Sequence, residues 1–145
     1  HIYLDHIHSS NASQIDVQAL KGKHILLAED NPLNAEIAET MLKDAGFKVT
    51  VLKNGLQALE AVKQNKDTLF DCILMDIQMP VMNGFEATRA IRALPSVKAS
   101  IPIIALTANA FEEDKKASRE AGMNGHISKP VQMQVLLKTL ANVLL

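Results

Sequence analysis

The chain has 145 residues, of which 48% are hydrophobic and 21% charged, with a formal net charge of −1. This length fits one domain with a substantial core, and the composition is ordinary for a globular protein. The near-zero charge excludes a global basic field that would recruit nucleic acid or an anionic membrane, and no apolar run approaches the ~20 residues of a membrane span.

The first part of the chain differs from the rest. Residues 1 to about 21 include a polar stretch with Ser9, Ser10, Asn11 and Ser13 and no sustained periodicity, which is typical of a linker. We therefore expect residues 1–21 to be a linker or the tail of an upstream region, and residues 22–145 to form the folded domain. Because the sequence begins with His1, we expect it to be a piece of a longer protein.

From Lys23 onward, apolar runs alternate with helical patterns. A strand is predicted at His24–Glu29, and Asn31 and Pro32 then provide an N-cap and a proline at the first helical position. The helix that follows should bury the apolar positions that recur on one face, and Gly46 should end it. Those positions are Leu33, Ile37, Ala38, Met41, Leu42 and Ala45.

The same alternation continues to the end of the chain. Strands are predicted at Phe47–Leu52, in the run that ends at Asp76, at Ile101–Leu106 and near His126–Ser128. Helices should follow Asn54-Gly55, run from about Gly84 to Pro95, begin near Glu112 and end at Gly122, and close the chain from Val131 onward. Five strands in strict alternation with five helices predict a parallel sheet with helices on both faces.

Reactive side chains stand where these strands end. Asp76 closes the run Cys72-Ile73-Leu74-Met75, and Glu29-Asp30 closes Ile25-Leu26-Leu27-Ala28. In an open parallel sheet, ligands bind beyond the carboxyl ends of the strands. Three carboxylates there would repel one another, and Mg²⁺, which binds one or two carboxylates together with water and phosphate oxygens, would relieve that repulsion.

Thr107 and Lys129 follow the last two strands and would add a hydroxyl and an ammonium to this edge. Phosphoryl transfer needs positioning and charge neutralisation, which these groups and Mg²⁺ can provide, with Asp76 as the nucleophile. Each residue also has a purely structural interpretation: the acids and Thr107 can cap helices, and Lys129 can be a solvated lysine before a proline.

The order of these motifs resembles the receiver domains of two-component signalling, over residues from about Lys23 to Leu145. The matching segments are Ile25–Asn31, Met75–Gly84, Ile101–Ala108 and Ser128-Lys129-Pro130. The residues in these motifs are most similar to those of receivers attached to hybrid sensor histidine kinases. The resemblance implies a flavodoxin-like (βα)5 three-layer sandwich with strand order 2-1-3-4-5, an order for which a receiver is a standard example.

The resemblance also implies a role for each site residue. Asp76 would be the phosphoacceptor, with Mg²⁺ bound by Asp30, Asp76 and the backbone carbonyl of Gln78, and less directly by Glu29. Thr107 and Lys129 would contact the phosphoryl group, and the Lys129–Pro130 bond would be cis. Gln78 and Asn109 would tune hydrolysis of the acyl phosphate.

Two positions depart from the family pattern. Asn83 stands where Asp is common, outside the metal cluster, so we expect little effect. His126 stands at the aromatic switch position, where a weaker apolar side chain and a pH-sensitive charge put the usual switch in doubt; a partly exposed strand residue is the simpler interpretation.

The implied function is a receiver that takes a phosphoryl group from a phosphohistidine, then passes it to a histidine-containing phosphotransfer domain or changes conformation. Because the sequence ends with the last helix, we expect a relay within a larger hybrid kinase in preference to a transcription factor, and the single Cys72 fits a cytoplasmic location. By family analogy, a partner would dock over the first helix near Asn34, Ala35 and Ala38.

Two alternatives stay open. A degenerate receiver could act purely as a protein-binding module, although the acceptor Asp, the acid pair and the Lys are all retained. A phosphatase of the haloacid dehalogenase type also uses a strand-end Asp and Mg²⁺, but it carries a second Asp two residues later, where this chain has Gln78. The domain itself would catalyse only its own phosphorylation and dephosphorylation.

Overall fold

Five parallel strands form one sheet in the order β2-β1-β3-β4-β5, as the family resemblance implied. The structure is a computed structural model that describes residues 18–64, 70–108 and 112–145. Its strands are β1 (His24–Ala28), β2 (Lys48–Leu52), β3 (Cys72–Asp76), β4 (Ile103–Thr107) and β5 (Gly125–Ser128). Its helices are α2 (Pro32–Asp44), α3 (Gly55–Gln64), α4 (Gly84–Arg92), α5 (Glu112–Ala121), α6 (Met133–Leu144) and the 3-10 helix η1 (Val97–Ser100).

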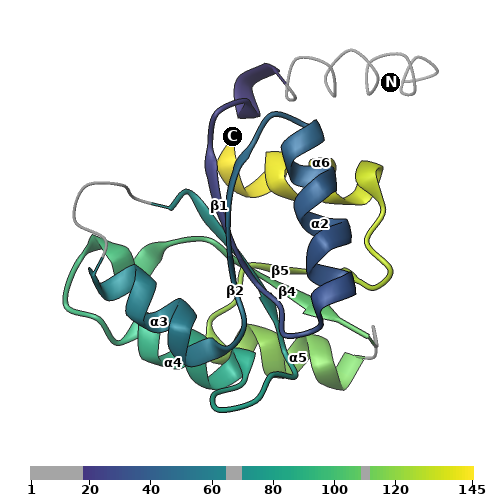
Figure 1. Ribbon diagram of the computed structural model, residues 1–145. Helices are drawn as coiled ribbons and strands as arrows, with labels where there is room; N and C mark the ends of the chain where they lie inside the picture. The colour runs from purple at the N-terminus through teal and green to yellow at the C-terminus, as the bar shows by residue number, and fades with distance from the viewer. Residues whose placement is uncertain (1–17, 65–69, 109–111) are drawn as a thin grey trace.

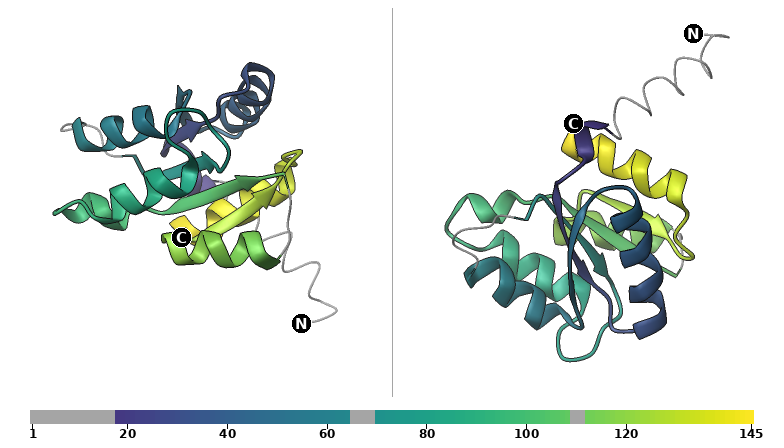
Figure 2. Two further views of the ribbon diagram at one scale, coloured as in Figure 1. Left: turned by 90° about the horizontal axis from the view of Figure 1, so that it is seen from below. Right: turned by 45° about the horizontal axis from the view of Figure 1, so that its top comes forward.

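The helices cover both faces of the sheet, which gives three layers (Figures 1 and 2). Alternate residues of each strand face opposite layers. In β1, Ile25 and Leu27 pack with Ala38 and Leu42 of α2 and with Leu136 of α6. The intervening residues, Leu26 and Ala28, pack instead with α3 and α4. The predicted α/β architecture is therefore confirmed.

The strand register aligns the carboxyl ends of the central strands. Asp76 at the end of β3 pairs with Leu106, Thr107 at the end of β4 pairs with Ser128, and Ala28 at the end of β1 pairs with Met75. All five residues of β3 and of β4 are buried. The residues that follow these strands, including Glu29 and Lys129, are thus delivered to one edge of the sheet.

Several boundaries differ from the predicted ones by one to three residues. Strand β1 ends at Ala28 and not at Glu29, β4 spans Ile103–Thr107, and α4 ends at Arg92, before Pro95. A residue preceding proline disfavours the helical conformation, which explains why α4 stops early. The short helix η1 between α4 and β4 was not predicted.

The apolar face of α2 is narrower than its sequence pattern indicated. The buried positions are Ala35, Ala38 and Leu42, whereas Leu33 and Ile37 are 64% and 45% exposed. Ala35 and Ala38 are buried, although Ala38 also lines a small hollow on this side of the helix, so the docking contact expected near them stays a prediction. The accessible apolar surface of α2 is provided by Leu33 and Ile37.

The packed core extends to a residue that precedes the expected domain boundary. Leu20 comes before the expected domain boundary at residue 22. It is only 1% exposed and packs in the same hydrophobic cluster as residues of α6.

Cys72 is fully buried in β3, and burial raises the pKa of its thiol to about 12. Within the described residues, no helix is both long and apolar enough to span a membrane.

Candidate functional site

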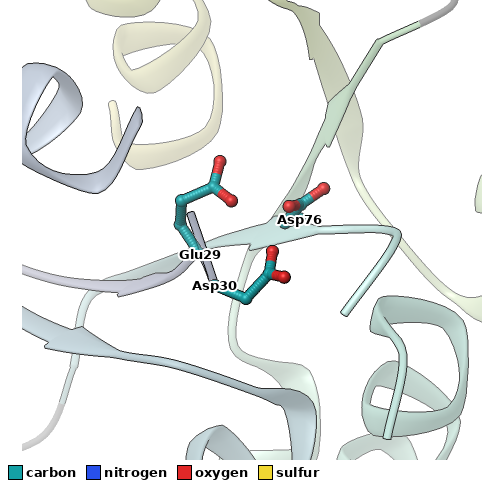
Figure 3. A group of neighbouring side chains, drawn as sticks. All are labelled: Glu29, Asp30 and Asp76. Atoms are coloured by element: carbon teal, nitrogen blue, oxygen red, sulfur yellow. The ribbon is translucent and has the colours of Figure 1, made fainter. Parts of the chain in front are cut away.

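Three carboxylates meet at the carboxyl edge of the sheet. Ligand oxygens of Glu29, Asp30 and Asp76 lie within 4.8 Å of one another, and Figure 3 shows the three side chains gathered from the ends of β1 and β3. Glu29 and Asp76 are 2% and 5% exposed, whereas Asp30 is exposed to solvent. Oxygen ligands at this spacing, in a cluster that is open to solvent on the side of Asp30, suit a hard divalent cation such as Mg²⁺.

Lys129 joins the two buried acids. Its Nζ lies 2.8 Å from Oε1 of Glu29 and 3.1 Å from Oδ2 of Asp76. The peptide bond from Lys129 to Pro130 is cis, as the resemblance implied, and the Lys129 backbone N–H donates to the Thr107 carbonyl at 2.8 Å. The Lys129 ammonium thus contacts both buried carboxylates, which excludes the interpretation of Lys129 as a fully solvated lysine.

The pKa values of the two buried carboxyls, Glu29 and Asp76, are shifted in opposite directions. Burial, followed by the adjacent Glu29 carboxyl, raises the pKa of Asp76 to about 7. Burial acts in the same upward direction on Glu29, but hydrogen bonds with Asp76 and Lys129 outweigh it and lower the pKa of Glu29. The pKa of Lys129 is raised, because contacts with the two carboxyls outweigh the opposing effect of burial. The site therefore holds more negative charge than one ammonium neutralises.

A cleft of about 310 Å³ opens above these groups. It contains the predicted residues Glu29, Asp30, Asp76, Gln78, Thr107 and Lys129. Thr107, at the end of β4, is buried, and the Gln78 backbone N–H donates to Oδ1 of Asp76 at 3.3 Å. The cleft can thus bring a small anion into contact with a carboxylate, a hydroxyl and an ammonium at once.

One predicted residue lies apart from this group, and the position of another is not described. His126 lies in β5, paired with Ala105, and does not line the cleft. Asn109 falls outside the described residues. Neither observation supports or contradicts the roles expected for them.

The structure adds Asn31 and Asn34 to the cleft. Asn31 caps α2 by accepting from the Asn34 backbone N–H at 3.0 Å, and its own N–H donates to Oε2 of Glu29 at 3.2 Å. The sequence pattern identified only the cap. Its position two residues after Glu29 was the signal that the cap also orients that carboxylate.

The loop after β3 packs closely against the site. A Cβ on Gly84 would lie 2.3 Å from the Asp76 carbonyl oxygen, and the Gly84 N–H donates to the Ile77 carbonyl. Only glycine allows α4 to start this close to the Asp76 backbone. The start of α4 therefore helps to fix the backbone from which Asp76 projects.

Comparisons with known proteins agree with this geometry. The chain is 40% identical over 135 residues to hybrid signal transduction histidine kinase I of Dictyostelium discoideum, and 39% identical over 124 residues to the sensor protein GacS of Pseudomonas syringae pv. syringae. These matches cover 91% and 81% of this chain but only 8% and 13% of those proteins. The chain thus spans a small fraction of the length of the curated relatives that it matches.

Solved structures of single receiver domains match most of this chain and most of their own length. The receiver domain of sensor histidine kinase PA1611 from Pseudomonas aeruginosa PAO1, solved with magnesium in its active site cleft, matches with a TM-score of 0.77 and 41% identity. That match covers 85% of this chain and 98% of the PA1611 domain. The receiver domain of Ssk1 in complex with the histidine phosphotransfer protein Ypd1, from Saccharomyces cerevisiae, matches with a TM-score of 0.76 and 28% identity, covering 86% of this chain and 90% of that one.

A family model for the response regulator receiver domain matches residues 25–141, which include β2 to β5, all of β1 except His24 and the greater part of the last helix. The chain belongs to the response regulator receiver domain family.

Proposed function

We propose that this domain accepts a phosphoryl group from a phosphohistidine onto Asp76, with Mg²⁺, and passes it on to a histidine-containing phosphotransfer domain or uses it to change conformation. The observation that carries the proposal is the position of Asp76, buried at the floor of the cleft between Lys129 and a second acid. A carboxylate in that position is protected from bulk water on all sides except the one from which a phosphoryl group can approach.

The chemistry follows from the groups in the cleft. An Asp76 oxygen attacks phosphorus, and the electron pair of the breaking bond leaves with the donor nitrogen. The Lys129 ammonium and the Thr107 hydroxyl bind phosphoryl oxygens; the ammonium is released from its contact with Asp76 as that carboxylate becomes an acyl phosphate.

Glu29, Asp30, Asp76 and the Gln78 backbone carbonyl are the groups that would hold Mg²⁺. The fit is supported by the three carboxylates within 4.8 Å and by the raised pKa of Asp76, which is caused first by burial and then by the adjacent Glu29 carboxyl. When bound, the ion neutralises the charge of the carboxylates and the charge of the phosphoryl oxygens. Gln78 and Asn109 would then govern the access of water to the acyl phosphate, and Thr107 and His126 would carry the change to the surface.

A partner carrying the phosphohistidine would dock on α2. Leu33 and Ile37 are exposed on this helix, and Ile37 lines a small hollow with Pro130 and Val131 beside the cleft. The complex of Ypd1 with a related receiver supports a phosphotransfer domain as the partner. Several of the relatives are named as hybrid kinases, so we propose that the parent protein is one and that this domain lies in the cytoplasm.

The first experiment is an intact-mass assay with acetyl phosphate and Mg²⁺. We expect one added phosphoryl group, which is lost in Asp76→Ala and in the presence of a chelator, and retained in the matched carboxylate variant Asp44→Ala at the exposed end of α2. Since some receivers ignore small donors, a negative result is repeated with a phosphorylated histidine phosphotransfer protein. Failure with both donors contradicts the proposal and favours a protein-binding module, while sustained release of phosphate from many phosphomonoesters would favour the phosphatase.

Docking is tested separately by Ile37→Glu. We expect transfer from the phosphorylated partner protein to fall about tenfold or more, because a charge would be buried in an apolar contact, while phosphorylation by acetyl phosphate is unchanged. Val97→Glu, at an apolar position on η1 that is even more exposed than Ile37, is the control and should leave both reactions unaffected. If Ile37→Glu slows both donors equally, the docking surface is wrong.

A further inference from the structure

Asn34 occupies the boundary between the reaction cleft and the proposed docking surface. It is the third residue of α2, and its side chain is exposed. It lines the cleft that contains Asp76 and Lys129, and it also lines the adjoining hollow formed with Ile37, Pro130 and Val131. A group that reaches Asp76 from a partner seated over this hollow therefore comes close to the Asn34 side chain.

On the α2 side of the cleft, the other polar side chains already have partners or roles, whereas the exposed Gln78 amide belongs to the loop after β3. Asp30 belongs to the acidic cluster, and Asn31 uses its side-chain oxygen to cap α2. Lys129 is held by Glu29 and Asp76. By contrast, within the part of the chain that the structure describes, no hydrogen bond involves the side-chain amide of Asn34; its backbone N–H alone makes the capping contact. Its side chain is therefore available to a ligand without cost to the helix.

The donor brings a polar group of its own to this place. In a phosphohistidine, one ring nitrogen carries the phosphoryl group and the other, when protonated, carries an N–H. For in-line attack by Asp76, the imidazole must lie on the far side of phosphorus from the Asp76 oxygen, which is toward the mouth of the cleft. An N–H there needs an acceptor once the partner excludes water.

We propose that the side-chain oxygen of Asn34 accepts a hydrogen bond from this ring N–H and so holds the leaving imidazole in line with Asp76. This inference rests on the proposed phosphohistidine donor. In the step, the bond between an Asp76 oxygen and phosphorus forms as the phosphorus–nitrogen bond breaks. The electron pair returns to the ring, and the phosphoimidazolium, already protonated at the other nitrogen, leaves as neutral imidazole without a further proton transfer.

The test compares two small donors, so that no partner protein is needed. Phosphoimidazole carries the ring and acetyl phosphate does not. For each variant, the readout is the ratio of the second-order rate constants for the two donors, followed by intact mass in the presence of Mg²⁺. In Asn34→Ala we expect this ratio to fall about five- to tenfold, the size of effect expected for losing one hydrogen bond.

Two further variants separate this role from a general effect on the site. Asn34→Asp retains an acceptor oxygen, so the ratio should stay at or above the unsubstituted value even if the added charge slows both donors. Glu36→Ala, an exposed change in the same turn of α2 that does not line the cleft, should leave the ratio unchanged. Thermal melts of each variant establish that it is folded.

The outcomes are distinct. An unchanged ratio in Asn34→Ala, or an equal fall in Glu36→Ala, overturns the role of Asn34. If the unsubstituted domain reacts with neither these donors nor a phosphorylated partner protein, the proposed function itself is wrong. A lowered ratio in Asn34→Ala that Asn34→Asp restores supports Asn34 as the group that contacts the leaving imidazole.

Discussion

At the scale of single residues, Asp76 is held in a position that favours the protonated carboxyl. Its pKa lies at about 7, against 3.8 for an ordinary aspartate, because the group is buried beside Glu29. The folded protein therefore binds this proton more tightly than the unfolded chain does. Ionising Asp76 costs stability, and that cost grows as the pH rises from about 4 to about 7.

Asp76→Asn should remove this cost. At pH 8 in the presence of a chelator, we expect the variant to be more stable by about 1–2 kcal/mol, a rise in Tm of roughly 3–8 °C for a domain of this size. The difference should shrink steadily as the pH is lowered toward 4, where both proteins carry a neutral side chain in the fold. Calorimetry across this range is the measurement, and a difference that does not change with pH would contradict the argument.

Val81 is a second strained position near the site. Its φ is +69°, and the Met82 N–H donates to the Pro80 carbonyl at 2.7 Å, which makes Val81 the centre of a γ-turn. A β-branched residue is unfavourable in this conformation, and at 76% exposure the side chain gains little from packing.

Val81→Asn should therefore stabilise the domain by about 0.5–1 kcal/mol, since asparagine tolerates positive φ better than valine. Val97→Asn is the matched control, because Val97 is 83% exposed but its φ is not positive. Chemical denaturation would measure both. Equal changes in the two variants would mean that loss of exposed apolar surface, and not backbone strain, is responsible.

At the scale of the elements, Arg92 joins the end of α4 to two other segments of the chain, residues 99–101 and residues 122–124. Its guanidinium donates to the carbonyls of Ala99 and Ile101, both at 2.7 Å, and to that of Gly122 at 2.9 Å. A fourth hydrogen bond, of 2.8 Å, reaches Oδ1 of Asn124. The fork of guanidinium donors is suited to this arrangement, and an ammonium would satisfy only part of it.

Arg92→Lys should thus destabilise the domain by about 1–3 kcal/mol, because partly buried carbonyls would be left without donors. Arg89→Lys, an exposed change one turn earlier in the same helix, should stay within about 0.5 kcal/mol of the unsubstituted protein. Urea denaturation followed by circular dichroism would compare them. A small effect at Arg92 would show that water replaces the guanidinium at little cost.

The sequence predicted elements better than it predicted their contacts. The cap at Asn31-Pro32 and the apolar runs of β1, β3 and β4 are local signals, so the elements and their order were foreseen. The contacts of Arg92 go to backbone carbonyls whose positions depend on the tertiary fold, and no local pattern encodes them. The exposure of Leu33 and Ile37 was not predicted, for a related reason. The apolar periodicity identifies which face of the helix is apolar, but it does not tell how much of that face is covered by the sheet.

At the scale of the whole molecule, Mg²⁺ binding and folding are linked through the acidic cluster. An ion bound only by the folded state stabilises it, by ~2.7 kcal/mol at a hundredfold excess over the dissociation constant. We expect the Tm to rise with Mg²⁺, and the rise to be lost in Asp30→Asn, whose exposed side chain contributes little to the fold otherwise. Asp44→Asn should respond as the unsubstituted protein does, and an equal response in both variants would place the ion elsewhere.

The site was predicted in outline because strand ends in a parallel sheet converge whatever their distance in sequence. Glu29, Asp76 and Lys129 could be grouped on that ground alone. What the strand pattern could not give is the ion pair of Lys129 with both acids, since it depends on where the ammonium at the end of a flexible side chain comes to rest.

The burial of Cys72 has a practical consequence for following this domain in solution. It is the only cysteine in the chain, and its thiol is both inaccessible and held in the unreactive protonated form. A second cysteine introduced at the surface, for example by Gln57→Cys near the start of α3, would be the single site for a maleimide dye or a spin label. Motions that accompany phosphorylation can thus be reported from one chosen position in an otherwise native sequence.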